Sequence, residues 1–288
     1  FGMDAAILFS DIMTPLEGMG IDLRFAPGPV IDNPIRSAAD VERLRPLEPE
    51  EGVPFVLETC RNLSAELPDT VPLIGFAGAP FTLLCYLIEG RGTKSFVEAR
   101  AFLRRELDAA RLLLDKLAYA QAVYLEAQAR AGARALMIFD SWVGLLDAPT
   151  FRALERPAIA KILEHLRPLG VPLIYFPNQG AHLHAEVAGL DADVIGVDWR
   201  IPLEDADEAL GGEFALQGNL DPSTLFAPPE AMLTAADSVL DAGRSLTRGH
   251  IFNLGHGIDK STDPDQVARL VDHVHAAPVR GADAGANA

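Results

Sequence analysis

Polar side chains that could bind or protonate a small molecule follow several apolar runs of this sequence. Asp11 follows the run that begins at Ala6, Ser141 follows a run ending in Phe139 and Asp140, and His256 stands between two glycines. Carboxylate, hydroxyl and imidazole groups suit proton transfer and the recognition of polar ligands. Flanking glycines let a ligand approach an imidazole closely, so we expect a functional role for His256.

Three of these positions also have a purely structural interpretation. Asp11 and Ser141 are residue types that cap helices, and either could serve only as an N-cap. Tyr86 lies six residues beyond Pro80, which is placed to open a helix, and a buried aromatic there could simply be a core residue. From the residues alone, both interpretations remain open.

Two classes of enzyme site find little support in the sequence. A Schiff-base aldolase needs a lysine at a strand end, and the nearest lysines fall in helical or loop contexts. Zinc sites need His, Cys or carboxylate ligands at characteristic spacings, which neither the histidines nor Cys60 and Cys85 show. We therefore expect polar recognition without a metal or redox cofactor.

Short apolar runs alternate with longer amphipathic stretches, a pattern typical of a parallel sheet covered by helices. The strand-like runs are residues 6–10, 72–77, 136–140, 172–177, 194–199, 214–218 and 251–255. The helical stretches include residues 102–131, 149–169 and 228–240. The sequence thus predicts an α/β protein.

A (β/α)₈ TIM barrel is the expected architecture. No Gly-x-Gly-x-x-Gly follows any strand, which disfavours a doubly wound dinucleotide fold. A barrel needs eight strands, so seven runs predict that the first βα unit is missing from this chain. We expect a single domain over residues 1–275, a disordered tail over residues 276–288, and an extended excursion or hairpin over residues 21–36.

Charge and composition narrow the partners and the compartment. The formal net charge is −17, which disfavours binding to nucleic acid and to anionic membranes. The two cysteines suggest neither a disulfide framework nor a zinc ribbon. No apolar run spans a bilayer and no signal segment is visible, so we expect a cytoplasmic protein with a small-molecule substrate.

Several runs at the predicted strand ends resemble the uroporphyrinogen decarboxylase family. They are residues 5–12 (AAILFSDI), 78–86 (GAPFTLLCY), 139–142 (FDSW), 217–222 (QGNLDP) and 253–258 (NLGHGI). The resemblance implies a homodimeric (β/α)₈ barrel that converts the four acetate side chains of uroporphyrinogen to methyls, giving coproporphyrinogen, without a metal or organic cofactor.

The resemblance also assigns roles to five residues. Asp11 would be the central carboxylate that holds the pyrrole N–H groups and stabilises developing positive charge. Tyr86, Ser141 and His256 would hydrogen-bond substrate carboxylates, and Phe139 would pack against the macrocycle.

One departure from the family pattern concerns positive charge. The family has a run of the form Met-Arg-Gln-Ala-Gly-Arg after its first strand, and this chain lacks it, so we expect weak or no activity from these 288 residues alone. The arginines in plausible loops are Arg24, Arg36, Arg91 and Arg200. The rival interpretations are a zinc-dependent cobalamin methyltransferase of the same superfamily and a barrel that binds tetrapyrrole without turnover.

Overall fold

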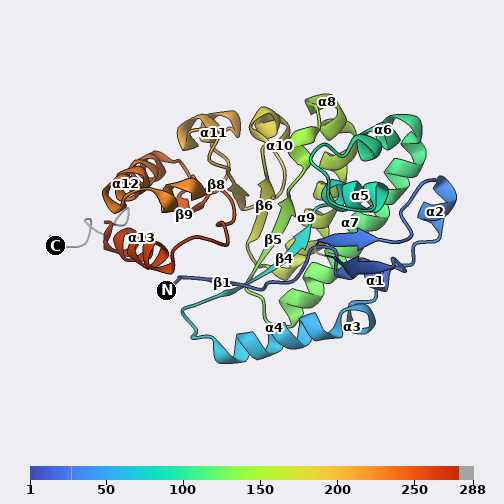
Figure 1. The fold of residues 1–288 in the computed structure, drawn as a ribbon, viewed down its shortest axis with the longest axis horizontal. Coiled ribbons are helices and arrows are strands. Elements are labelled where there is room, and N and C mark those ends of the chain that lie inside the picture. Colours follow the sequence, from blue (N-terminus) through green and yellow to red (C-terminus); the bar gives the residue numbers. More distant parts are fainter. Residues whose placement is uncertain (27, 279–288) are drawn as a thin grey trace. The chain divides into compact units, whose positions relative to one another are not determined.

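The computed structural model describes residues 1–26 and 28–278, which its contacts divide into two compact units. The larger unit comprises residues 4–193, and the smaller comprises residues 1–3 and the chain from residue 194 onward. In each unit parallel strands alternate with helices along the chain (Figure 1). The predicted α/β class is confirmed.

The larger unit contains four parallel strands in the order β1-β4-β5-β6 (Figure 1). Their bounds are Ala6–Ile7 for β1, Leu73–Gly78 for β4, Ala135–Asp140 for β5 and Leu173–Pro177 for β6. Every residue of β6 is buried. Continuous apolar runs of this kind are typical of parallel strands that are covered on both faces.

Helices of very different length connect and cover these strands. They are α1 Pro15–Gly18, α2 Ala38–Glu42, α3 Pro49–Gly52, α4 Pro54–Glu66, α5 Pro80–Glu89, α6 Val97–Arg105, α7 Leu107–Arg130, α8 Ala148–Thr150, α9 Arg156–Leu166 and α10 His184–Val187. A π-helix, Phe151–Glu155, joins α8 to α9. The helical stretch predicted over residues 149–169 is therefore present, but as consecutive segments of different helix types.

The helical stretch predicted over residues 102–131 is present, but it is divided between two helices. The chain leaves the helical conformation at Glu106 (φ −125°, ψ 52°), which separates α6 from α7. Both helices pack on α5, and α7 packs in addition on α9 and β4. Basic residues end α6 and Asp108 opens α7, as the helix dipoles favour.

The excursion predicted over residues 21–36 is a hairpin. Its strands, β2 (Leu23–Phe25) and β3 (Pro29–Ile31), pair antiparallel. It lies apart from the parallel strands and carries none of the predicted site residues.

The smaller unit contains three parallel strands in the order β7-β8-β9. Their bounds are Val194–Gly196, Ala215–Leu220 and His250–Leu254, and the helices are α11 Leu203–Ala209, α12 Pro229–Ser245 and α13 Pro264–Ala276. Leu220 and Leu225 pack with Met232, Ala236 and Leu270 in a buried cluster that holds α12 and α13 to the strands.

All seven predicted strands are present. The bounds of β4, β5, β6, β8 and β9 lie within two residues of the predicted runs, whereas β1 has two residues instead of five and β7 three instead of six. An eighth strand and a missing first βα unit stay predictions. Residues 279–288, most of the predicted disordered tail, lie outside the described residues, and residue 276 belongs to α13. Among the helices of residues 1–26 and 28–278, none combines the length and hydropathy needed to cross a bilayer.

Candidate active site

Asp11 lies in a turn that follows β1. Its Oδ1 accepts a hydrogen bond from the backbone N–H of Met13 over 2.8 Å, and its carbonyl accepts one from the N–H of Thr14 over 3.0 Å. The N-cap of α1 is Thr14, so Asp11 is not the cap of that helix. Oδ2 accepts no hydrogen bond from the residues described, and the side chain is half-buried. The turn therefore holds a carboxylate with one oxygen open to a ligand.

Tyr86 lies on α5, a helix that begins at Pro80 and whose residues are mostly buried. Tyr86 itself is half-buried. Burial raises the pKa of its hydroxyl, the indole N–H of Trp142 lowers it, and the negative charge of Asp11 raises it. Tyr86 and Asp11 are thus electrostatic neighbours, and the tyrosine remains a neutral hydrogen-bond donor at physiological pH.

Phe139 stands near the carboxyl end of β5 between two aromatic rings of the adjacent strands. Its ring centroid lies 5.9 Å from that of Phe76 on β4 and 6.1 Å from that of Phe176 on β6. Both pairs are edge-to-face, at interplanar angles of 79° and 84°. Phe139 is half-buried, so these contacts leave part of the ring available to a flat apolar ligand.

Ser141 is the first residue after β5. Its carbonyl accepts a hydrogen bond from Nδ2 of Asn178 over 3.1 Å. Trp142, not Ser141, is the N-cap of the following 3₁₀-helix, and the side-chain hydroxyl of Ser141 makes no hydrogen bond within the described part of the chain. The capping interpretation of Ser141 is wrong, and its half-buried hydroxyl is free to bind a ligand.

His256 belongs to the smaller unit and is exposed. Its ring lies edge-on to Trp199, with centroids 6.2 Å apart. The guanidinium of Arg200 covers the same indole at 3.8 Å and pairs with the buried Asp198 at 3.0 Å. These contacts place an imidazole and a guanidinium around one tryptophan.

Glycine is needed at position 255 for a reason other than the ligand access expected from the sequence. A Cβ on Gly255 would lie 2.5 Å from the backbone nitrogen of Trp199, so glycine is required by this close backbone approach. A Cβ on Gly257 would meet nothing within 4 Å. Neither observation depends on a ligand.

The structure brings four of the five predicted residues into one unit. Asp11 and Tyr86 interact electrostatically, Tyr86 contacts the Trp142 ring at 6.4 Å, and Phe139 and Ser141 flank the end of β5. His256 lies in the other unit.

The candidate arginines are largely engaged. Arg24 pairs with Asp32 at 2.8 Å within the hairpin, and Arg36 donates to the backbone carbonyls of Ile35 and Ile88. Arg200 forms an ion pair with Asp198 and stacks on Trp199, and its side chain is partly exposed. Arg200 is therefore the candidate held most firmly beside a predicted site residue.

A buried polar network, which the sequence interpretation did not identify as a unit, lies behind the end of β5. Oδ1 of Asp140 accepts from Oγ1 of Thr82 over 2.7 Å, and Oδ2 accepts from the hydroxyl of Tyr175 over 2.9 Å. Glu155 faces the same carboxylate, and both acidic groups are fully buried. Burial raises the pKa of Asp140 to about 6 and that of Glu155 well above its ordinary range.

The sequence does carry a signal for Glu155. It falls at helical spacing within an apolar stripe whose other members, including Phe151, Ala158, Ile159 and Ile162, are all buried. A carboxyl on such a stripe either pairs with a buried polar group or stays protonated.

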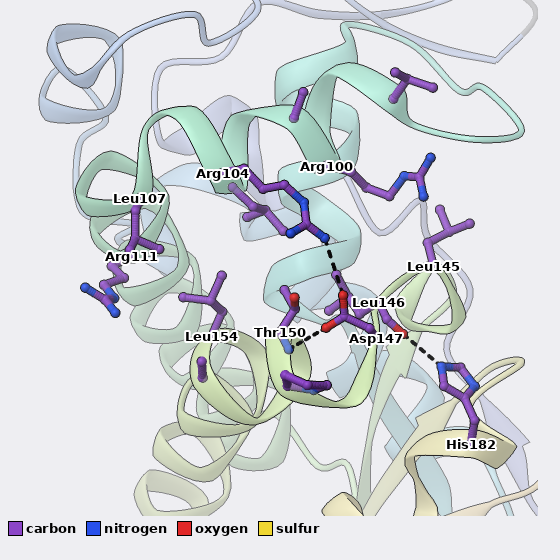
Figure 2. Close-up of a pocket in the computed structure, with 15 residues that line it drawn as sticks. Arg100, Arg104, Leu107, Arg111, Leu145, Leu146, Asp147, Thr150, Leu154 and His182 are labelled. Atoms are coloured by element: carbon purple, nitrogen blue, oxygen red, sulfur yellow. Dashed lines mark hydrogen bonds and ion pairs between the residues drawn. The ribbon is translucent and has the colours of Figure 1, made fainter.

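A groove of about 890 Å³ lies on the outer helices of the larger unit. Figure 2 shows Arg104 extending from α6 toward Asp147, with Arg100 one turn away on the same helix. Arg104 pairs with Asp147 at 3.3 Å, and His182 contacts the carbonyl of Leu146 at 2.8 Å. None of the five predicted site residues lines this groove.

The residues described contain no cluster of three or more His, Cys, Asp or Glu side chains able to hold a metal ion. The cofactor-free reaction stays a prediction.

Comparison with known proteins tests the resemblance directly. The family described as Uroporphyrinogen decarboxylase (URO-D) matches residues 1–277. A uroporphyrinogen decarboxylase of Carboxydothermus hydrogenoformans is 46% identical over 277 residues, covering 95% of this chain and 79% of the relative. One from Nocardioides sp. is 49% identical over 280 residues, covering 96% of this chain and 80% of the relative.

Among solved structures, a methyltransferase from Methanosarcina mazei aligns with 94% of this chain and 80% of its own, at a TM-score of 0.80 and 19% identity. At that identity the likeness concerns the fold. The family match across 277 residues and identities of 46–49% confirm the resemblance carried by the strand-end motifs, and the chain belongs to the uroporphyrinogen decarboxylase family.

Proposed function

We propose that this chain is a carboxy-lyase of porphyrin and heme biosynthesis. It removes CO₂ from the four acetate side chains of uroporphyrinogen III and leaves methyl groups, giving coproporphyrinogen III. The observation that carries the proposal is the family match over residues 1–277. The zinc-dependent methyltransferase alternative is not favoured, since the relatives at 46–49% identity are uroporphyrinogen decarboxylases.

The chemistry needs an electron sink, and the substrate can supply it. Protonation of a pyrrole carbon makes the ring iminium-like, and the carbon–carbon bond to the carboxylate then breaks as its electron pair moves toward the ring. CO₂ leaves, and the methylene that remains takes a proton to become a methyl group. The ring carbon then releases the proton it took up, which restores the pyrrole, so each cycle consumes one proton and releases one CO₂. The protein's task is therefore to bind, orient and stabilise charge.

Asp11 is the group that would stabilise this charge. Its open oxygen would accept the pyrrole N–H groups, and its negative charge would face the cation that forms on protonation. A fixed anion stabilises that cation more than it stabilises the neutral ground state, and the low dielectric of a cleft enlarges the difference. The hydrogen bond from Met13 supports this role by fixing the carboxylate before substrate binds.

Tyr86, Ser141 and His256 are proposed to hydrogen-bond the carboxylates of the substrate. The free hydroxyl of Ser141 and the neutral hydroxyl of Tyr86 support these assignments. Phe139 is proposed to pack against the macrocycle, which its partly available ring favours. Arg200 is a further candidate for a carboxylate partner, because it is oriented by Asp198.

We also propose a cytoplasmic homodimer and an eight-stranded barrel that is completed by a βα unit preceding β1. These rest on the family resemblance. Size-exclusion chromatography with light scattering on the complete gene product tests the dimer, and a monomeric mass at micromolar concentration would contradict it.

The decisive experiment is turnover. The complete gene product is incubated anaerobically with uroporphyrinogen III and a metal chelator, and the products are oxidised and separated by carboxyl number. We expect stepwise appearance of seven-, six-, five- and four-carboxyl porphyrins. Tight binding without products would favour the non-catalytic barrel, and activity restored only by zinc would favour the methyltransferase chemistry.

A further inference from the structure

The carboxyl of Glu155 lacks the partners that an anion would need. The side chain is fully buried, and neither oxygen accepts an N–H or O–H hydrogen bond of normal geometry from the residues described. The backbone N–H of Phe81 favours its charged form only weakly against the burial and the neighbouring Asp140. A buried, unpaired carboxylate is very costly, so such a group takes up a proton.

The hydrogen bonds of Asp140 show which of the two acids is the anion. Each of its oxygens already accepts from a hydroxyl, one from Thr82 at 2.7 Å and one from Tyr175 at 2.9 Å. A carboxyl with two donors directed at it is stabilised as the carboxylate. Glu155 has no such donors and faces that carboxylate, so the complementary arrangement is a protonated Glu155 that donates to Asp140.

The other ionisable groups around the pair do not alter this balance. Burial raises the pKa of the Cys85 thiol and of the Tyr175 hydroxyl well above their ordinary values, so both are neutral. Arg100 acts on Cys85 and is not among the groups that shift Asp140 or Glu155. Above about pH 6, where Asp140 is ionised, the pair therefore holds one negative charge and one proton.

The local helix geometry directs Glu155 inward. Glu155 ends the π-helix Phe151–Glu155, in which the N–H of Arg156 bonds to the carbonyl of Phe151, five residues back. The wider turn accommodates one extra residue relative to an α-helix, and such turns are frequent at functional sites.

The network reaches the proposed substrate site through Thr82. Its Oγ1 accepts the backbone N–H of Trp142 over 3.1 Å while its hydroxyl donates to Asp140. Thr82 lies on α5, one turn before Tyr86, and Trp142 follows Ser141. The same hydrogen bonds thus join the helix that carries Tyr86 to the end of the strand that carries Ser141.

We propose that Glu155 is a positioning residue whose protonated carboxyl donates a hydrogen bond to Asp140 and so completes the network that orients Tyr86 and Ser141. The orienting role rests on the proposed function, because it assumes that these two residues bind substrate. The hydrogen bond itself does not depend on the reaction.

The first test measures stability against pH in Glu155→Gln and in a matched control, Glu164→Gln. Glu164 is exposed on α9 and makes no ion pair with the residues described, and both variants remove one carboxyl. A proton held in the folded state but released on unfolding makes stability fall as pH rises between the two pKa values. The unfolding constant of wild type divided by that of Glu155→Gln should therefore rise above pH ~5, by up to about tenfold per pH unit, until the folded-state pKa of Glu155 is reached.

The unfolding constant of wild type divided by that of Glu164→Gln should not change with pH over this range. If the ratio for Glu155→Gln did not change with pH either, the proposal would be overturned. Infrared difference spectra over the pH range in which the ratio rises give an independent readout, since the C=O stretch of a protonated carboxylic acid should disappear in Glu155→Gln and persist in Glu164→Gln. Both measurements stand even if the protein does not decarboxylate uroporphyrinogen.

The second test separates positioning from folding in the complete gene product. Glu155→Gln keeps a donor for Asp140 and should keep KM for uroporphyrinogen within about twofold of wild type, whereas Glu155→Met removes the donor. Because misplaced binding groups weaken substrate and transition state alike, Glu155→Met should raise KM about tenfold with kcat little changed. A lowered kcat at unchanged KM would indicate only a loss of folded protein and would overturn the orienting role. If Glu155→Met does not fold, a raised KM in Glu155→Gln would overturn it instead.

Discussion

The backbone N–H of Met13 donates to Oδ1 of Asp11 over 2.8 Å and leaves Oδ2 without a hydrogen bond from the residues described. One oxygen thus fixes the carboxylate, while the other can meet a substrate. Oδ1 therefore has a structural role and Oδ2 the proposed chemical role, so the two roles can be tested separately.

Asp11→Asn should lower kcat by about 10²-fold or more, because the fixed negative charge that stabilises the cationic intermediate is lost. The Asn Oδ1 can still accept from Met13, so the free energy of unfolding should stay within ~0.5 kcal/mol of wild type. Steady-state kinetics and urea unfolding measure the two quantities. Asp22→Asn in the exposed loop before β2 is the matched control, and comparable loss of kcat in both variants would remove Asp11 from the mechanism.

Ser141→Ala should raise KM about five- to tenfold, the effect of one hydrogen bond to a charged group. Its thermal midpoint should not change, because the hydroxyl makes no hydrogen bond in the described structure. Equal KM for Ser141→Ala and wild type would argue against substrate binding by Ser141.

Thr82→Val provides the contrast, since it removes a buried hydroxyl that bonds both Asp140 and the Trp142 backbone. We expect Thr82→Val to lower the free energy of unfolding by ~1–3 kcal/mol.

His256→Gln should raise KM for uroporphyrinogen several-fold and leave folding intact, because the side chain is exposed and lies edge-on to the Trp199 ring. His273→Gln is the control, as His273 pairs with Asp237 at 2.7 Å on the surface of the same unit. Surface pairs of this kind contribute little to stability, about 0–1 kcal/mol. Isothermal titration with the product and initial-rate kinetics measure the effect, and indistinguishable values for both variants would count against His256.

Gly255→Ala should destabilise the protein by ~1–3 kcal/mol, because the new methyl would lie 2.5 Å from the backbone nitrogen of Trp199 and the chain must shift. Gly257→Ala, two residues away, should change stability by less than ~0.5 kcal/mol, since nothing lies within 4 Å of the added Cβ. Chemical denaturation compares the pair. If Gly257→Ala were the more damaging change, the close approach to Trp199 would not explain the glycine.

Much of the architecture follows from local pattern. Each of the seven strands lies in an apolar run. For fully buried strands such as β6 the reason is that parallel strands covered on both faces need continuous apolar sequence, whereas β1 and β9 carry exposed residues. The hairpin of β2 and β3 follows from Pro27, Gly28 and Pro29, which exclude a helix there. The candidate residues were found because they follow those strands, and the family motifs occur at the same positions.

The structure differs from the expectations where local pattern was compatible with two outcomes. The spacing of apolar residues continues through Glu106, yet the helix is interrupted there, with α6 packed on α5 and α7 packed on α5, α9 and β4. Gly255 was attributed to ligand access, and the cause is a backbone contact with a residue 56 positions earlier, counted from Trp199 to Gly255.

The sequence by itself thus determined the α/β class, the seven strands, the family and the residues at the strand ends, since these depend on short-range periodicity and on motifs. Only the tertiary structure decided that Ser141 caps no helix and that Oδ2 of Asp11 is open. It alone revealed that Glu155 faces Asp140. Thr82 and Tyr175 bond Asp140 from 58 and 35 residues away, and contacts over such separations exist only after the strands have paired and the helices have packed.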